Sequence, residues 1–219
     1  MIKENLQAIR ATIPKNVTLV AVSKTKPIEM IQELYDTGQR IFGENKVQEL
    51  VEKNEQLPND INWHLIGHLQ SNKVKYIASF VSMIHSVDSM KLLNEINKQA
   101  LKNDRVIDCL LQFHIAEEDS KFGLTLESAR ELLSSKEFAE MRNVSIRGVM
   151  GMATFTEDEE QVREEFRTLE NYFHVIQSHY FKFNPNFEHI SMGMSGDYKL
   201  AIEEGSTMVR VGSSIFGTR

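Results

Sequence analysis

A lysine directly after the first apolar segment is a candidate nucleophile. Residues 17–23 are β-branched and aliphatic and predict a buried strand, which Lys24 follows. Pro27 has no backbone N–H to donate, so the strand ends near Lys24. Apolar surroundings and a second cation, Lys26, favour the neutral amine over the ammonium form. A positioned neutral amine forms a Schiff base with an aldehyde, although a solvent-facing lysine is the simpler interpretation of this segment alone.

Two segments near the C-terminus combine small residues with hydroxyl groups, as anion-binding loops do. Residues 194–197 are Met-Ser-Gly-Asp and precede a predicted helix, and residues 212–214 are Gly-Ser-Ser. Glycine lets backbone N–H groups approach an anion, and serine hydroxyls add donors. Such turns are common, but their place after the last two predicted strands indicates a phosphate site in a barrel.

Arg210 lies in the last predicted strand and alternates there with Val209 and Val211. If the valines pack against a layer of surrounding helices, the arginine points to the other side, into the mouth of a barrel. A buried arginine needs a partner. The partner is either a carboxylate, with Glu203 and Glu204 as candidates, or a ligand atom that accepts a hydrogen bond.

These residues need a scaffold that gathers strand ends. Short apolar segments alternate with amphipathic ones, and eight strands are predicted at residues 17–23, 40–42, 63–66, 83–86, 106–114, 146–150, 189–192 and 208–211. Helices are expected at residues 5–12, 28–37, 46–55, 72–78, 89–102, 126–133, 157–178 and 198–204. Thr156 and Ser89 are expected to cap the helices that follow them.

Eight strands that alternate with helices indicate a (β/α)8 TIM barrel, with an open doubly wound sheet as the competing architecture. Polar or small residues follow almost every predicted strand, for example at residues 43–45 and 151–154. A barrel gathers all its strand ends at one face, whereas an open sheet concentrates such residues at its switch point. We therefore expect one α/β barrel domain over residues 1–219, with an extra N-terminal helix.

Composition and charge exclude several classes of function. The net charge of −6 argues against a nucleic-acid partner, and no apolar segment approaches the roughly 20 residues of a membrane span. The single cysteine, Cys109, cannot form an intrachain disulfide and indicates a reducing compartment. The N-terminal residues carry charges where a signal peptide needs an apolar region. A cytoplasmic protein is expected.

No metal site is predicted. His64 and His68 are four residues apart, which would suit a metal pair on a helix. Their segment is instead a predicted strand that ends in glycine. His68 and His114 are expected at the barrel mouth, and the charged loop 117–123 is a candidate gate for a site there. Lys73, like Lys26, is more simply a surface lysine than a second aldehyde site.

Five motifs of the chain match a known family in the right order. They are residues 21–27, 42–49, 63–73, 191–197 and 205–217, and the resemblance that they carry covers essentially the whole chain. The sequence closely resembles the pyridoxal phosphate homeostasis proteins, single-domain relatives of the N-terminal barrel of alanine racemase. The resemblance implies a fold-type III barrel that binds pyridoxal 5′-phosphate (PLP).

The resemblance also implies roles for individual residues. Lys24 matches the lysine that forms the internal aldimine, a Schiff base, and Asn45 matches the ring-contacting asparagine. Arg210 matches the arginine that faces the pyridine nitrogen. The phosphate-binding positions are matched by Ser195, Gly196, Gly212 and Ser213.

Proteins of this family are regarded as non-enzymatic carriers that buffer intracellular PLP and supply it to apo-enzymes, and they tend to be monomers. The alternative is a PLP-dependent racemase or decarboxylase. The opposite-face tyrosine of alanine racemase belongs to a second, β-rich domain, and the tyrosines here all fall in predicted helices: Tyr35, Tyr76, Tyr172, Tyr180 and Tyr198. We therefore expect no catalytic residue and no turnover. A sugar-phosphate isomerase that uses Lys24 without a cofactor is a weaker alternative.

Overall fold

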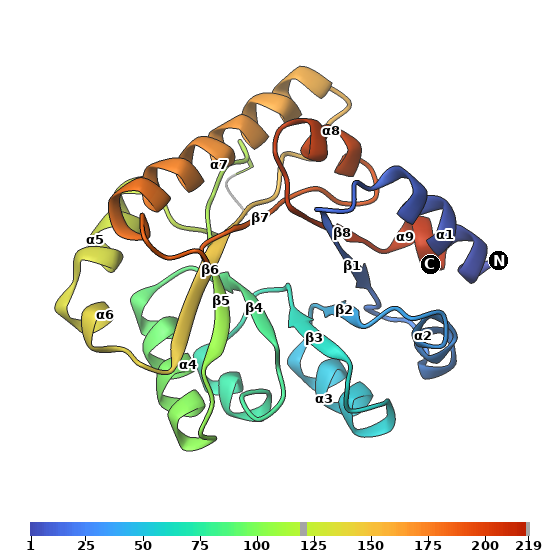
Figure 1. The fold of residues 1–219 in the computed structure, drawn as a ribbon, viewed down its shortest axis with the longest axis horizontal. Helices are drawn as coiled ribbons and strands as arrows, with labels where there is room; N and C mark the ends of the chain where they lie inside the picture. The colour runs from blue at the N-terminus through green and yellow to red at the C-terminus, as the bar shows by residue number, and fades with distance from the viewer. Residues whose placement is uncertain (119–121, 218–219) are drawn as a thin grey trace.

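The computed structural model describes residues 1–118 and 122–217 and forms a closed barrel of eight parallel strands (Figure 1). Each strand pairs with its neighbours in chain order, and the last pairs with the first. The strands are β1 (Thr18–Val22), β2 (Ile41–Glu44), β3 (Asn62–Leu65), β4 (Met83–Val87), β5 (Ile107–Gln112), β6 (Val144–Met150), β7 (His189–Ser191) and β8 (Met208–Val211). The expected barrel is confirmed, and the open sheet is excluded.

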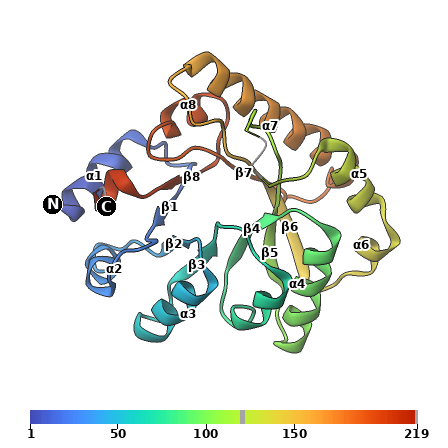
Figure 2. The same cartoon turned by 180° about the vertical axis from the view of Figure 1, so that it is seen from behind.

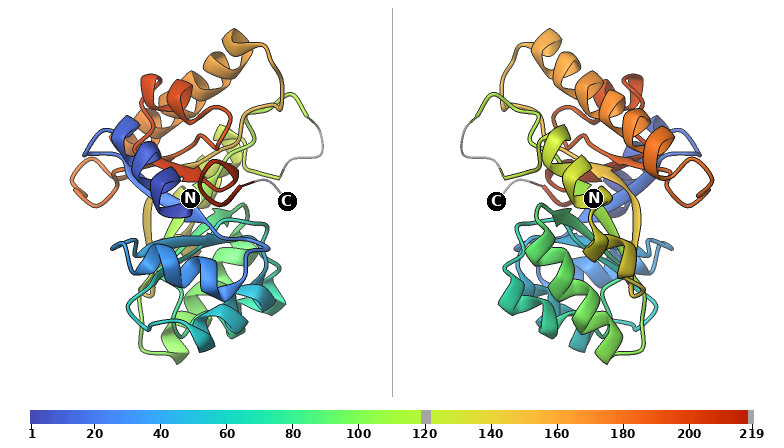
Figure 3. Two further views of the ribbon diagram at one scale, coloured as in Figure 1. Left: turned by 90° about the vertical axis from the view of Figure 1, so that its right-hand side faces the viewer. Right: turned by 90° about the vertical axis from the view of Figure 1, so that its left-hand side faces the viewer.

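Helices surround the barrel, as Figure 2 shows from behind. They are α1 (Ile2–Thr12), α2 (Ile28–Tyr35), α3 (Val47–Gln56), the 3-10 helix η1 (Ser71–Tyr76), α4 (Met90–Lys102), α5 (Leu126–Ser134), α6 (Lys136–Glu140), α7 (Glu159–Tyr180), α8 (Tyr198–Glu203) and α9 (Ser213–Phe216). The extra N-terminal helix α1 packs against α9, so the first and the last described helices lie side by side (Figure 3). The side-chain amide of Asn5 donates to the carbonyl of Ile215 at 3.0 Å.

Alternation along the strands divides the apolar residues between two cores. The larger core fills the space between sheet and helices and includes Val209 and Val211 of β8. The smaller core lies inside the barrel and consists of Val20, Met83, Leu110, Met150 and Met208. Arg210 alternates with the two valines and therefore points inward, as predicted. Cys109 is fully buried in the larger core, where it packs as a small apolar residue.

The predicted elements exist, and their ends differ for local reasons. Asp158, not Thr156, caps α7: its carboxylate accepts from the N–H groups of Glu160 and Gln161 at 3.1 and 3.2 Å. The expectation that Thr156 is the cap was therefore wrong. The expected cap Ser89 is confirmed, since it accepts from Leu92 at 3.2 Å. The helices α6 and α9 were not predicted because five and four residues are too short to show periodicity.

Among the described residues, none of the helices combines the length and apolar character that crossing a bilayer requires.

Candidate functional site

Lys24 leaves β1 at the C-terminal end of the barrel, the face on which (β/α)8 barrels build their sites. Its side chain is exposed. The expectation of apolar surroundings was therefore wrong, because the strand ends two residues earlier, at Val22. Thr25 has a φ of 63°, in the left-handed region that costs energy for residues other than glycine. The backbone on both sides of Lys24 must therefore be held by other contacts.

A buried ionic group, which we call the Lys53 cluster (Ser23, Glu44, Glu49 and Lys53), provides these contacts. The Lys53 ammonium donates to the carbonyl of Ser23 at 2.7 Å and to carboxylate oxygens of Glu44 and Glu49 at 2.6 and 2.7 Å. The same Glu49 oxygen accepts from the backbone N–H of Thr25 at 2.5 Å. Since an ammonium has three donors, Lys53 is fully paired. Both neighbours of Lys24 are thus tied to α3.

Glu44 completes the Lys53 cluster from the end of β2. It is fully buried and also accepts from the Ser23 hydroxyl at 2.6 Å. Burial raises the pKa of Glu44, while the ammonium of Lys53 opposes this effect. Sequence reasoning missed the cluster. The available signal was Lys53 in the apolar stripe of α3, three residues after Leu50 and four before Leu57.

The loops after β7 and β8 meet at one oxygen atom. The Ser195 hydroxyl oxygen accepts from the backbone N–H groups of Gly212 and Ser214 at 3.1 and 3.4 Å. Within residues 1–118 and 122–217, the backbone N–H groups of Ser195, Gly196 and Ser213 have no hydrogen-bond partner. These donors lie on two adjacent loops, and Gly196 faces open space. The arrangement fits an anion such as a phosphate group.

Two glycines make this approach of the loops possible. A Cβ atom on Gly212 would lie 3.0 Å from the carbonyl oxygen of Val22 at the end of β1. Gly193 has a φ of 96°, and a Cβ there would lie 2.6 Å from the Cβ of Ala201 in α8. The loop after β8 is therefore packed closely against β1, and the loop after β7 is packed closely against the short helix α8 that follows it.

Arg210 is buried, with 3% of its surface exposed, and both its terminal nitrogens are held. Nη1 donates to the Ser191 hydroxyl oxygen at 2.6 Å, and Nη2 donates to the carbonyl of Gly151 at 3.0 Å. Burial lowers the pKa of Arg210 to about 10, and the nearby carboxylate of Asp197 acts in the opposite direction. The guanidinium is therefore still charged at neutral pH.

Of the two alternatives for the partner of Arg210, the carboxylates Glu203 and Glu204 are wrong. Glu203 and Glu204 lie on the outside of the barrel and pair with Arg163 of α7 at 2.6 and 2.8 Å. Glu204 also pairs with Arg167 at 3.0 Å. These ion pairs join α8 to α7, so they support the loop after β7 rather than the buried arginine.

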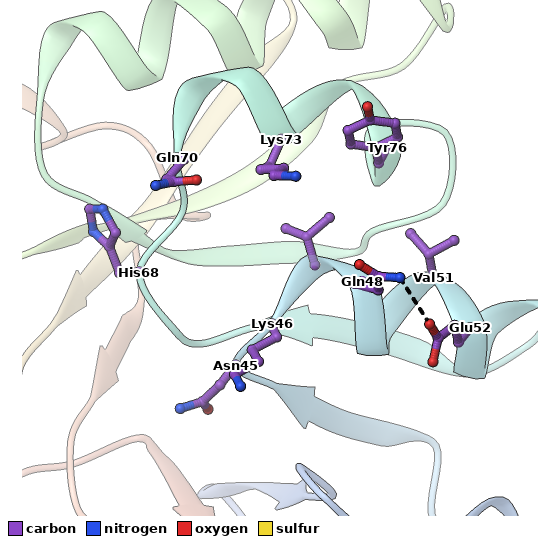
Figure 4. A pocket seen from close by; sticks show the side chains of 10 residues that line it. Asn45, Lys46, Gln48, Val51, Glu52, His68, Gln70, Lys73 and Tyr76 are labelled. Carbon is purple, nitrogen blue, oxygen red and sulfur yellow. Dashed lines mark hydrogen bonds between the residues drawn. The ribbon is translucent and has the colours of Figure 1, made fainter.

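Asn45 follows β2 and lines a pocket of about 670 Å³ that extends away from the barrel mouth between α3 and η1. Figure 4 shows Asn45, Lys46 and Gln48 on one wall, and His68, Gln70 and Lys73 on the other. Lys24 does not line this pocket. The pocket is therefore an extension beside the site and not its centre.

The other residues that were expected at the mouth differ in their contacts and burial. His68 stacks on Phe122 with ring centroids 4.1 Å apart, and its Nδ1 lies 3.8 Å from the Asp88 carboxylate. His114 is partly buried, and its Nδ1 has no partner among the described residues. Residues 119–121 of the candidate gating loop lie outside the described residues, so gating stays a prediction. Lys26 donates to the carbonyl of Gly217 at 3.0 Å.

The topology brings the main candidates into one sector of the mouth. Lys24 and Asn45 follow the adjacent strands β1 and β2, and the candidate anion-binding loops follow β7 and β8, which complete the sector. Arg210 points inward from β8 beneath it. An exposed amine, anion-binding N–H groups and a fixed cation are the groups that a phosphorylated aldehyde with a ring nitrogen needs. Within the described ranges, no His, Cys, Asp or Glu side chains cluster in a way that could hold a metal.

Comparison with known proteins agrees with this geometry. The model of the alanine racemase N-terminal domain family matches residues 1–219. The pyridoxal phosphate homeostasis protein of Aquifex aeolicus (strain VF5) is 43% identical over 202 residues, 92% of this chain and 86% of that protein. The protein of the same name from Escherichia coli (strain K12) is 37% identical over 210 residues, 94% of this chain and 87% of that protein.

Solved structures show the same likeness. PipY of Synechococcus elongatus PCC7942 without PLP is 35% identical, with a TM-score of 0.92 over 99% of this chain and 100% of that chain. The PLP-bound structure of PipY has a TM-score of 0.89 and 34% identity over the same shares. Alanine racemase of Clostridium difficile 630 is 13% identical, with a TM-score of 0.75 over 100% of this chain and 56% of that chain, which shows the fold alone. The chain therefore belongs to the alanine racemase N-terminal domain family and, within it, to the pyridoxal phosphate homeostasis proteins.

Proposed function

We propose that this protein binds PLP through Lys24 and maintains the supply of the cofactor in the cell. The observation that carries the proposal is the common sector of the amine, the anion-binding loops and Arg210. Relatives over 35% identical are named for PLP homeostasis, and PipY has been solved with PLP bound. PLP supplies a reactive aldehyde and an electron-withdrawing ring when bound.

Each residue of the sector has a role in this proposal. Lys24 is the amine that links to the aldehyde. Asn45 contacts the ring, and Arg210 directs its guanidinium at the ring nitrogen. A permanent cation there favours an unprotonated nitrogen, which makes the ring a weaker electron sink than a carboxylate partner would. The phosphate is held by Ser195, Gly196, Gly212 and Ser213.

The proposed role is that of a carrier without turnover, which acts as a monomeric single domain in the cytoplasm and passes PLP to apo-enzymes. Racemisation needs a second acid or base on the opposite face of the substrate. The tyrosines of the described residues all lie in helices: Tyr35, Tyr76, Tyr172, Tyr180 and Tyr198. Tyr198, which follows the loop after β7, has its hydroxyl 2.8 Å from that of Thr12 in α1. We infer that none of these tyrosines takes the place of the catalytic tyrosine of alanine racemase.

The first test is a visible absorption spectrum of the purified protein with added PLP, followed by borohydride reduction and peptide mapping. We expect a reducible covalent link that maps to Lys24. Lys24→Ala should abolish the link and keep some phosphate-anchored binding, while the control Lys26→Ala should keep it. A protein that stays colourless with added PLP would contradict the proposal and favour a cofactor-free sugar-phosphate isomerase.

A second test separates a carrier from an enzyme. The loaded protein is incubated with single L-amino acids, and D-amino acid, amine and carbon dioxide are measured. A carrier gives none of these products and transfers PLP to an added apo-enzyme. Sustained product release would contradict the non-enzymatic part of the proposal and leave PLP binding intact.

A further inference from the structure

Four polar side chains form a continuous hydrogen-bonded chain inside the barrel, below the proposed site. Arg210 Nη1 lies 2.6 Å from Ser191 Oγ, which lies 3.0 Å from Nδ1 of His85. Nε2 of His85 then lies 2.9 Å from Nδ1 of His64. The residues come from β8, β7, β4 and β3, and each is at most 5% exposed. PLP binding as proposed uses only the arginine.

The arginine sets the direction of every bond in this chain. A guanidinium can only donate, so Ser191 Oγ accepts from it. The single hydroxyl hydrogen of Ser191 is then donated to His85 Nδ1, which must be unprotonated in order to accept it. A neutral imidazole carries one ring proton, so His85 holds it on Nε2 and donates to Nδ1 of His64. Since Nδ1 of His64 accepts this hydrogen bond, it carries no proton, and the single ring proton of neutral His64 is on Nε2.

The reverse direction is chemically possible but leaves a group unpaired. If His85 donated from Nδ1, Ser191 Oγ would accept twice, and its own hydrogen would need another acceptor. The described part of the chain offers none, because the only contacts of this hydroxyl are with Arg210 and His85. Ser191 is fully buried, and a buried donor without an acceptor is costly.

Protonation of either imidazole would also leave the hydroxyl hydrogen of Ser191 without an acceptor among the described residues. A doubly protonated His85 would present a donor to Ser191 beside the charged Arg210. The groups that face the pair are His189 of β7 and Arg210 of β8, and both disfavour a further positive charge. Burial lowers the pKa of His85 well below its ordinary value and that of His64 to about 3.

We propose that Ser191, His85 and His64 are positioning residues that hold Arg210 through a one-way hydrogen-bond chain in which both imidazoles carry their proton on Nε2. Successive bonds in one direction polarise one another, so the Ser191 oxygen becomes a stronger acceptor for the guanidinium. With Gly151 on Nη2, the plane of the guanidinium is fixed. The purpose of this fixed plane rests on the proposed function, in which Arg210 faces the ring nitrogen. The existence of the hydrogen-bond chain does not depend on that function.

The test is the tautomeric state of the two histidines in the full-length protein without added PLP. Long-range ¹H–¹⁵N correlation spectra at neutral pH distinguish a protonated ring nitrogen from a bare one. The variants His64→Gln and His85→Gln assign the signals. We expect the proton of both rings on Nε2. A proton on Nδ1 of either ring, or a doubly protonated ring, would overturn the proposal.

A matched pair of serine variants tests the function of the chain. Ser191→Ala removes the link, whereas the control Ser86→Ala removes a fully buried hydroxyl that has no partner among the described residues. We expect Ser191→Ala, and not Ser86→Ala, to produce a second His85 population protonated on Nδ1. In the PLP-loaded protein, Ser191→Ala should also change the pH profile of the visible absorption while Lys24 still captures the aldehyde.

An unchanged tautomer and an unchanged pH profile in Ser191→Ala would overturn the positioning role. If the variant does not fold, the tautomers of the wild-type protein still decide the direction of the chain. Failure of the proposed function is distinguishable, because the wild-type protein would then not capture PLP although its histidines carried the expected protons.

Discussion

Lys53 donates a hydrogen bond of 2.7 Å to the backbone carbonyl of Ser23, the residue directly before Lys24. The exposed amine of the site is thus positioned from below by a buried ammonium of α3. The other two bonds of Lys53 neutralise its charge, and Glu49 extends the contact to Thr25 on the far side of Lys24. A surface lysine gains a defined position in this way without being buried itself.

Lys53→Met should therefore weaken both the fold and the capture of PLP. Removing one member of a buried ion pair typically costs about 3–5 kcal/mol, since the other charge is left uncompensated. Urea unfolding measures the stability, and the rate of borohydride-trapped product at Lys24 measures the capture. The exposed Lys91→Met is the control, and Glu44→Gln added to Lys53→Met should restore part of the stability. Equal capture rates in Lys53→Met and the wild-type protein would contradict the positioning role of Lys53.

The buried His64 should make stability depend on pH. Its pKa is about 3 in the folded protein against an ordinary value of 6.5, so between these values the unfolded chain binds a proton that the folded chain does not. The free energy of unfolding therefore falls as the pH is lowered through this window. One such imidazole accounts for about 2 kcal/mol between neutral pH and pH 5.

Urea titrations at several pH values check this expectation. His64→Gln should reduce the slope of stability against pH, whereas His174→Gln, which changes an exposed histidine, should leave it as in the wild-type protein. The prediction is wrong if both variants keep the wild-type slope.

Gly212→Ala should disturb the junction of the loop after β8 with β1. The new methyl group would lie 3.0 Å from the carbonyl oxygen of Val22, and inserting a methyl group in a packed place typically costs about 1–3 kcal/mol. Gly196→Ala adds the same group in open space and should change stability by less than about 0.5 kcal/mol. Thermal unfolding of the two variants decides between these outcomes, and equal losses would contradict the close approach.

Ser195→Ala combined with Ser213→Ala should weaken the retention of PLP and leave the chemistry of Lys24 available. A hydrogen bond to a charged group is worth about 1.5–3 kcal/mol, so the loss of one such bond weakens binding about 10- to 100-fold. Equilibrium dialysis measures the affinity, and borohydride trapping at saturating PLP measures the link to Lys24. Wild-type affinity in the double variant would remove these two serines from the phosphate site.

The sequence by itself determined the barrel, the order of its elements and the strand ends that carry the site. Strand and helix periodicities are local properties, so eight alternating units and the inward direction of Arg210 could be predicted without coordinates. The glycine-serine segments after the last two strands predicted two loops with accessible backbone N–H groups, because local residue choice exposes such groups. Phosphate binding by these loops stays a prediction. The matching motifs added which of these residues should face PLP.

Only the tertiary structure decided the partners of the buried charged groups. Arg210 pairs with Ser191 of β7 and with Gly151, directly after β6, which are 19 and 59 residues away in the chain, and not with the nearby glutamates. Lys53 lies under Lys24 because β2 and α3 fold against β1. Closure of the barrel fixes the distances between these residues, and a long polar side chain donates to whichever acceptor closure brings within reach. Periodicity shows which side of a strand or helix a residue faces, but it does not show which groups lie opposite that residue in the folded protein.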